Sequence, residues 1–207
     1  MFVSLDGVDG GGKSTQLRLL ADWLRASGFD VVQCRDPGST PLGDQLRNLL
    51  LNRADLAIDR RSEMLVYMAA RAQLVEEVIR PALASGKFVL CDRFLVANIV
   101  YQAHAGGLAA DQVRAVGEIA VAGIMPDLVL ILDLPPEVAA GRINRPLDRM
   151  EMQGAEFTRR VRAGFLSEAA RDPGRLRVID ASRGIAEIQD ELRAAITAKL
   201  ASHVPQP

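Results

Sequence analysis

Short apolar runs alternate along the chain with longer stretches in which apolar residues return every three or four positions. The runs predict β-strands and cover residues 2–5, 29–34, 87–91, 128–134 and 176–180. The stretches with helical spacing predict a first helix that ends at Ser27-Gly28, helices over 42–51, 63–80, 95–104, 109–123 and 151–170, and a last helix that ends near Leu200. Strands that alternate with helices predict a doubly wound α/β fold, with helices on both faces of one sheet.

Residues 128–134 form the most strand-like run, and their nearly continuous apolar character suits a strand covered on both faces. The sheet is therefore expected to be parallel. In such folds ligands bind beyond the carboxyl ends of the strands, so polar residues directly after each run are candidates for a functional site. We expect Pro81 to end the helix that starts at Glu63.

Length and composition suit a single domain over residues 1–207, because 207 residues with 49% hydrophobic content can bury a full core. Lys and Arg number 25 against 26 Asp and Glu, so no overall field favours nucleic acid or an anionic membrane. No apolar run approaches the roughly 20 residues of a membrane-spanning helix. The first strand begins next to Met1 and leaves no room for a targeting segment, so we expect a cytoplasmic protein, with residues 202–207 as a frayed tail.

The two cysteines, Cys34 and Cys91, both end apolar runs and are expected to be inert packing thiols. The two histidines, His104 and His203, are too few for a histidine-based zinc cluster.

The strongest functional signal lies between the first apolar run and the first helix. These residues fit the phosphate-binding pattern G-x-x-x-x-G-K-[ST]: Gly7, Val8, Asp9, Gly10, Gly11, Gly12, Lys13, Ser14 and Thr15. Glycines let successive backbone N–H groups face phosphate oxygens at the positive end of the following helix. Lys13 is expected to reach the β- and γ-phosphates of a nucleoside triphosphate, and Ser14 to ligate magnesium.

A second polar pair, Asp92-Arg93, ends a buried strand on the ligand side of the predicted sheet. There the carboxylate can organise the magnesium shell, and the guanidinium can bind phosphate through two hydrogen bonds. Further arginines occur in segments able to approach the same edge: Arg35, Arg47, Arg71, Arg142, Arg145 and Arg149. Phosphoryl transfer depends on aligning two phosphate-bearing substrates and neutralising their charge, and many arginines suit that task.

Tyr67 and Arg71 lie four residues apart on one predicted helix, so the ring and the guanidinium project into the same space. The ring can stack on a base while the guanidinium donates hydrogen bonds to a carbonyl of that base. The same spacing also suits a half-buried tyrosine beside a salt-bridged arginine.

Taken together, the motifs resemble those of bacterial thymidylate kinases, and the resemblance covers nearly the whole chain. It depends on the segments 6–9, 35–40, 63–71, 92–94, 101–102, 126–128, 132–133, 148–151 and 179–181, in this order. The family implies the architecture of P-loop nucleoside monophosphate kinases, and Mg²⁺-assisted transfer of a phosphoryl group from ATP to dTMP in dTTP synthesis.

The resemblance also implies roles for individual residues of the acceptor pocket. Asp9 would contact the 3′-hydroxyl of the deoxyribose, and Arg35, Arg47 and Arg93 would hold the acceptor phosphate. Tyr67 would stack on thymine, Arg71 would bind a base carbonyl, and Asn98 would bind the N3–H edge. Tyr101 would crowd the 2′ position of the sugar, and Gln102 joins this set.

A lid over residues 141–152 is implied as well, with Arg142, Arg145 and Arg149 as candidate catalytic cations beside Lys13, Arg93 and Asp9. Gly10 stands where other members carry an arginine in the loop, so the lid has to provide the cation that stabilises the transition state. Ser14 and Asp92 are the candidate magnesium residues. Family members usually form homodimers through helix packing, and a homodimer is expected here.

Two other functions remain open on these residues. The first is a kinase for another pyrimidine monophosphate or for a deoxynucleoside. The second is a catalytically silent nucleotide-binding module or switch. A GTPase should carry an N-K-x-D motif, whereas the last strand ends in Asp180-Ala181-Ser182; partition-type ATPases carry a lysine early in the loop, where this chain has Val8-Asp9.

Overall fold

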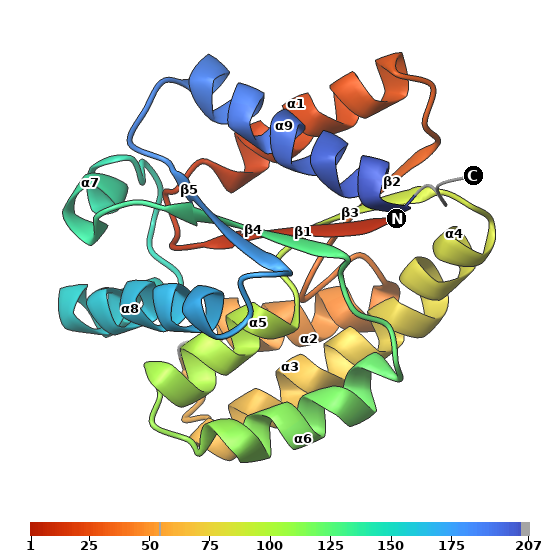
Figure 1. Cartoon of the computed structure of the whole chain (residues 1–207). Helices are drawn as coiled ribbons and strands as arrows, with labels where there is room; N and C mark the ends of the chain where they lie inside the picture. Colours follow the sequence, from red (N-terminus) through yellow and green to blue (C-terminus); the bar gives the residue numbers. More distant parts are fainter. Residues whose placement is uncertain (54, 204–207) are drawn as a thin grey trace.

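A parallel β-sheet lies between two layers of helices in the computed structural model, which describes residues 1–53 and 55–203 (Figure 1). In these residues the strands are β1 (Phe2–Gly7), β2 (Val31–Arg35), β3 (Phe88–Asp92), β4 (Leu128–Asp133) and β5 (Leu176–Asp180). Their order in the sheet is β2-β3-β1-β4-β5, and each neighbouring pair is parallel. The predicted α/β fold is confirmed.

Strand β1 lies at the centre of the sheet, with β3 and β2 on one side and β4 and β5 on the other. It pairs with β3 on one side, where Leu5 faces Asp92, and with β4 on the other, where Leu5 faces Leu130. The carboxyl end of β1 is therefore the topological switch point, which is where such folds bind ligands. The candidate phosphate-binding loop begins at this point.

Strand β4 has the burial that its apolar run predicts. Leu130 and Leu132 are fully buried, because helices cover both faces of the sheet. Complete burial of each such side chain stabilises the fold by about 1.5–3 kcal/mol. The central strands therefore give the loops at their carboxyl ends a rigid base.

Helices α1 (Lys13–Ala26) and α9 (Ile185–His203) lie together on one face of the sheet (Figure 1). The other face is covered by α2 (Pro41–Asn52), α3 (Arg60–Leu74), α5 (Leu95–Asn98), α6 (Ala110–Val121) and α8 (Ala155–Arg171). Shorter elements complete the described chain: η1 (Val75–Ile79), α4 (Arg80–Ala84), η2 (Ile99–His104), α7 (Pro136–Gly141) and η3 (Glu151–Gln153).

The prediction that Pro81 ends the helix was wrong. The helical path continues through η1 and α4 to Ala84. Proline disfavours a helix interior because it lacks an N–H and its ring meets the carbonyl four residues earlier. Here η1 is a π-helical turn, in which Arg80 N donates to Val75 O, and this wider turn directly before Pro81 changes the local hydrogen bonding.

The predicted helix over 151–170 is two elements in the structure. Gly154, with a φ of 89°, separates the short η3 from α8. An extra short helix, α7, follows β4 and leads into residues 141–152, the predicted lid. At the other end, α9 extends to His203 and so includes the start of the predicted tail, while residues 204–207 lie outside the described residues.

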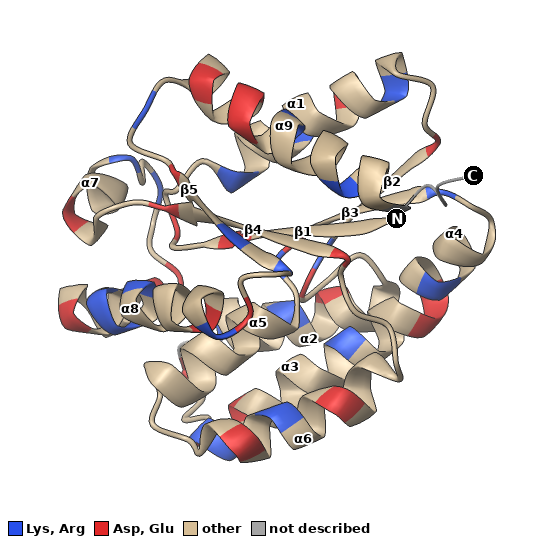
Figure 2. Cartoon of the chain, in the orientation of Figure 1, with Lys and Arg blue, Asp and Glu red and all other residues tan. Residues whose placement is uncertain are grey.

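Cys34 and Cys91 face each other in the β2–β3 register, and both are free and buried, as expected for packing thiols. Among the described residues, no helix combines the length and apolar character needed to cross a membrane. Basic and acidic residues are interspersed over the helices in the view of Figure 2, in line with the balanced composition.

Candidate active site

The phosphate-binding loop joins β1 to α1, as predicted. Gly12 caps α1 in a left-handed conformation, with a φ of 87°, and Lys13 is the first helical residue. Gly10 also has a positive φ, 78°, and a Cβ at this position would lie 2.3 Å from Ala139 O in α7. A side chain at position 10 would collide with α7, which gives a physical reason for glycine at this position.

Lys13 lies within the loop and is almost completely buried, with 7% exposure. Its Nζ donates to Val8 O at 2.8 Å and Gly7 O at 3.2 Å, and lies 3.7 Å from Asp9 Oδ1. Burial, together with the charge of Arg93, lowers the pKa of Lys13. The ammonium group is therefore held in one place beside the glycine-rich backbone.

Arg93 connects this loop with the end of β3. Its Nη2 donates to Asp9 Oδ1 at 2.6 Å, and its Nη1 donates to Gly7 O at 2.7 Å. The second Asp9 oxygen accepts from Tyr101 Oη at 3.0 Å. Burial raises the pKa of Asp9, but the charges of Arg93 and Lys13 outweigh it and hold that pKa well below its usual range.

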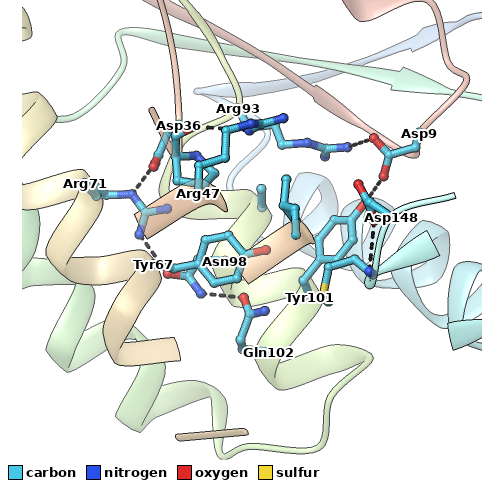
Figure 3. A pocket seen from close by; sticks show the side chains of 14 residues that line it. Asp9, Asp36, Arg47, Tyr67, Arg71, Arg93, Asn98, Tyr101, Gln102 and Asp148 are labelled. Carbon is cyan, nitrogen blue, oxygen red and sulfur yellow. Dashed lines mark hydrogen bonds and ion pairs between the residues drawn. The ribbon is translucent and has the colours of Figure 1, made fainter. Parts of the chain in front are cut away.

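We refer to the cavity beside Asp9 and Arg93, where the resemblance implies the acceptor substrate, as the acceptor pocket (Figure 3). The predicted substrate-binding residues that line it are Asp9, Arg47, Tyr67, Arg71, Arg93, Asn98, Tyr101 and Gln102. They come from separate segments of the chain, which the fold brings together. Arg35 is the exception, since it lines the neighbouring cavity and donates to Asp44 Oδ1 at 3.0 Å.

Arg71 is a buried residue with a buried partner. Its Nε donates to Asp36 Oδ2 at 2.6 Å, and its Nη1 donates to Asn98 Oδ1 at 2.8 Å. Arg71 therefore faces the pocket, as the base-binding interpretation expects, and is also salt-bridged, as the competing interpretation expects. The geometry is compatible with both.

We refer to the cavity over the glycine-rich loop, where the motif predicts the triphosphate, as the donor pocket; its volume is about 690 Å³. It is lined by loop residues 9–15, by Asp92 and Arg93, and by Arg142 and Arg145 of the lid. Asp9, Asp36, Arg47 and Arg93 line both pockets, so the two cavities meet at these side chains.

Lid residues differ in where their guanidinium groups point. Arg142 Nη1 donates to Ala181 O at 3.2 Å, and Arg145 forms a bidentate ion pair with Glu151 at 2.7 and 2.8 Å. Arg149 instead donates to Leu50 O at 2.6 Å and pairs with Glu63. Arg149 does not line the donor pocket, so the geometry favours Arg142 and Arg145 as the lid cations.

Magnesium would require oxygen ligands near the loop hydroxyl. Ser14 and Asp92 both line the donor pocket, and Asp92 Oδ1 has no hydrogen-bond partner among the described residues. Mg²⁺ binds through few protein oxygens and keeps several waters. The residues present therefore fit the ion.

Some pocket residues were not among the predicted site residues. Arg183, Gly184, Ile185 and Ile188, at the start of α9, line the donor pocket, and Asp36, Asp148 and Met150 line the acceptor pocket. The segment 183–185 follows the last strand at its carboxyl end, so the rule for ligand sites in parallel sheets already pointed to it.

The comparisons agree on one family. A model of the thymidylate kinase family matches residues 5–192. The thymidylate kinase of Pelotomaculum thermopropionicum is 46% identical over 198 residues, which cover 94% of this chain and 92% of that protein. That of Symbiobacterium thermophilum is 43% identical over 197 residues, with 95% and 92% covered.

A solved structure leads to the same family. The crystal structure of thymidylate kinase from Ehrlichia chaffeensis aligns with a TM-score of 0.79 at 32% identity, covering 95% of this chain and 98% of that one. The match of the family model, the identity to curated relatives and the shared fold lead to one conclusion: this chain belongs to the thymidylate kinase family.

Proposed function

We propose that this chain transfers the γ-phosphoryl group of ATP to dTMP, giving ADP and dTDP, a step in dTTP synthesis. The cavity over the phosphate-binding loop and the pocket for a base share the side chains of Asp9, Asp36, Arg47 and Arg93, and this shared lining carries the proposal. Transfer requires the two phosphates to come together in line, and these side chains stand where both phosphates would lie. The family assignment supports the same reaction.

In the acceptor pocket we assign the base to Tyr67, Arg71 and Asn98. Tyr67 stacks on thymine, Arg71 donates to a carbonyl, and Asn98 binds the N3–H edge. Tyr101 is held against Asp9 by a 3.0 Å hydrogen bond and crowds the 2′ position of the sugar. Arg93, Arg47 and Arg35 hold the acceptor phosphate. Gln102 accepts a hydrogen bond from Asn98 and so helps to fix the Asn98 amide.

In the donor pocket the loop N–H groups and Lys13 bind the triphosphate, and Arg142 and Arg145 close over it. Ser14 and Asp92 would hold magnesium, which would neutralise negative charge on the phosphates. The lid cations approach charge that spreads over the transferred group, so they stabilise the transition state more than the ground state.

A homodimer is supported by the exposed apolar residues Leu65 on α3, 52% exposed, and Ile119 on α6, 80% exposed, since α3 and α6 pack side by side. A cytoplasmic location without nucleic-acid or membrane partners fits the balanced charge.

Acceptor preference tests the function directly. ADP formation with Mg-ATP should be fastest with dTMP in a panel that also holds dUMP, UMP, dCMP, CMP, AMP, GMP and thymidine. The physical reason is a pocket that offers a guanidinium donor and an amide to a thymine edge and has little room at the 2′ position. Preference for another acceptor would refute the base assignments, and no turnover with any of them would favour a silent binding module.

Replacement of Arg71 by alanine tests the base assignment. The apparent KM for dTMP should rise at least about tenfold while that for ATP changes little, because a charge-assisted hydrogen bond to the base is lost. The variant should also lose about 3–5 kcal/mol of unfolding free energy, because buried Asp36 loses its partner.

Steady-state kinetics and urea unfolding check both parts. Arg71→Lys keeps a cation beside Asp36 and serves as the control for stability. An unchanged KM for dTMP in Arg71→Ala would contradict the base assignment and leave Arg71 with a structural role only.

A further inference from the structure

A continuous chain of polar side chains runs beneath the acceptor pocket and ends at the lid. Its members alternate between segments far apart in the sequence and are, in order of contact, Asp36, Arg71, Asn98, Gln102, Glu63 and Arg149. Figure 3 shows the part from Asp36 to Gln102 along the floor of the pocket. The last two contacts, Gln102 to Glu63 and Glu63 to Arg149, lead out of the pocket.

The charged members fix the direction of every hydrogen bond in this chain. Arg71 can only donate, so Asn98 accepts from it through Oδ1 at 2.8 Å. Asn98 Nδ2 then donates to Gln102 Oε1, and Gln102 Nε2 donates to Glu63 Oε1 at 3.0 Å. The Glu63 carboxylate can only accept. The two amides lie between the cation Arg71 and the anion Glu63. These two charges therefore allow a single orientation for both amides.

Burial makes this arrangement strict. Glu63 is 1% exposed and Gln102 is 1% exposed, so water cannot replace a lost partner. A buried polar group without a partner costs about 1–3 kcal/mol, and more when it is charged. Asn98 consequently presents one fixed edge to the pocket, and that edge depends on Glu63 although Glu63 does not line the pocket.

At its other oxygen Glu63 holds the end of the lid. Arg149 pairs with Glu63, and its Nε donates to Leu50 O at 2.6 Å while its backbone N lies 3.2 Å from Leu51 O. The residues on either side of it, Asp148 and Met150, line the acceptor pocket. Glu63 thus links the Gln102 and Asn98 amides with Arg149, near the end of the predicted lid.

We infer that Glu63 is a positioning residue with two tasks: it sets the orientation of the Gln102 and Asn98 amides that select the acceptor base, and through Arg149 it anchors the lid. The first task rests on the proposed function. Thymine offers an N3–H donor and an O4 acceptor, whereas cytosine offers an N3 acceptor and an amino donor. Asn98 Oδ1 accepts from Arg71 and keeps a second lone pair. That lone pair can accept from the N3–H of thymine but not from the unprotonated N3 of cytosine, so an amide held in this orientation favours thymine.

Glu63→Gln tests both tasks with a side chain of the same size. The introduced amide can donate or accept, so it no longer sets the orientation of its neighbours, and it has no charge to hold Arg149. The ratio of kcat/KM for dTMP to that for dCMP should fall at least about tenfold, mainly through KM. Tryptic cleavage after Arg142 and Arg149, followed by mass spectrometry on the protein without substrates, should become several-fold faster.

The matched control is Glu168→Gln. Glu168 is also a buried glutamate, 5% exposed, and pairs with Arg114 at 2.5 Å and His104 at 2.7 Å, but it lines a different cavity. Both variants should lose stability, since each replaces one carboxylate of a buried ion pair. Altered acceptor selectivity and faster lid cleavage should occur only in Glu63→Gln.

Gln102→Met separates the two tasks and serves if Glu63→Gln does not fold. It removes the link between Asn98 and Glu63 but keeps the Glu63–Arg149 pair. Selectivity should fall, while lid cleavage stays at the parent rate. Parent selectivity in either variant, or equal changes in Glu168→Gln, would overturn the inference. If the parent does not phosphorylate dTMP, the proposed function fails, and the cleavage rates still decide whether Glu63 anchors the lid.

Discussion

Replacement of Lys13 by alanine should lower turnover more than ~100-fold at saturating ATP and dTMP. In the structure Lys13 Nζ is fixed by two loop carbonyls at 2.8 and 3.2 Å, and the side chain is 7% exposed. A cation already placed where negative charge develops needs no reorganisation during the reaction, and its burial strengthens the interaction. Coupled measurement of ADP formation provides the turnover number.

The control for this variant is Arg18→Ala on the same helix. Arg18 is 66% exposed and forms a long surface pair with Asp22 at 3.7 Å, so its removal should leave turnover unchanged. Equal melting temperatures of the two variants would exclude unfolding as the cause. Turnover close to that of the parent in Lys13→Ala would remove the loop lysine from the mechanism.

The sequence predicted the sheet and the loop well because both depend on local patterns. A run of apolar residues predicts strand β4, and a run of glycines predicts the turn after β1. In the structure Gly10 and Gly12 of this turn have positive φ angles. Fold class and the position of the phosphate-binding loop require only neighbours in sequence. These parts needed no knowledge of tertiary contacts.

Helix ends were harder, because tertiary packing can override a local signal. Pro81 is a strong stop signal, yet the π-helical turn before it lets the helical path continue to Ala84. Gly154 divides a segment whose apolar spacing suggested one helix. A single glycine inside a periodic pattern is ambiguous from sequence alone, since it can be tolerated or can end the helix.

The periodicity of residue types could not predict ion pairs between residues that are far apart in the sequence. Arg71 could be assigned to the pocket from its spacing with Tyr67, but its ion pair with Asp36 spans 35 positions. The role of Arg149 was predicted from the motif in the lid, whereas the structure has it paired with Glu63, 86 positions away. Such contacts arise only when separate strands and helices are assembled, so they could not be read from the spacing of residue types.

Replacement of Arg93 by alanine should have an effect as large as that of Lys13→Ala, with turnover reduced about 10²–10³-fold, the range found when one donor to transition-state charge is removed. Arg93 lines both pockets, and it joins β3 to the loop through Asp9 at 2.6 Å and Gly7 O at 2.7 Å. Arg93→Lys keeps the charge but cannot make both bonds in the same plane, so its turnover should be intermediate.

A second result distinguishes this variant from a general loss of fold. Burial raises the pKa of Asp9, but Arg93 and Lys13 together outweigh it and hold that pKa below its ordinary value of 3.8, so the Arg93–Asp9 pair stabilises the folded state above that pH. The stabilisation is lost as the pH falls below 3.8 toward the lowered pKa of the folded state. The difference in melting temperature between the parent and Arg93→Ala should therefore be largest near pH 7 and shrink toward about pH 3. A difference that is constant over this range, or turnover in Arg93→Ala equal to that of the parent, would contradict the role of Arg93 in holding Asp9 beside the reacting phosphates.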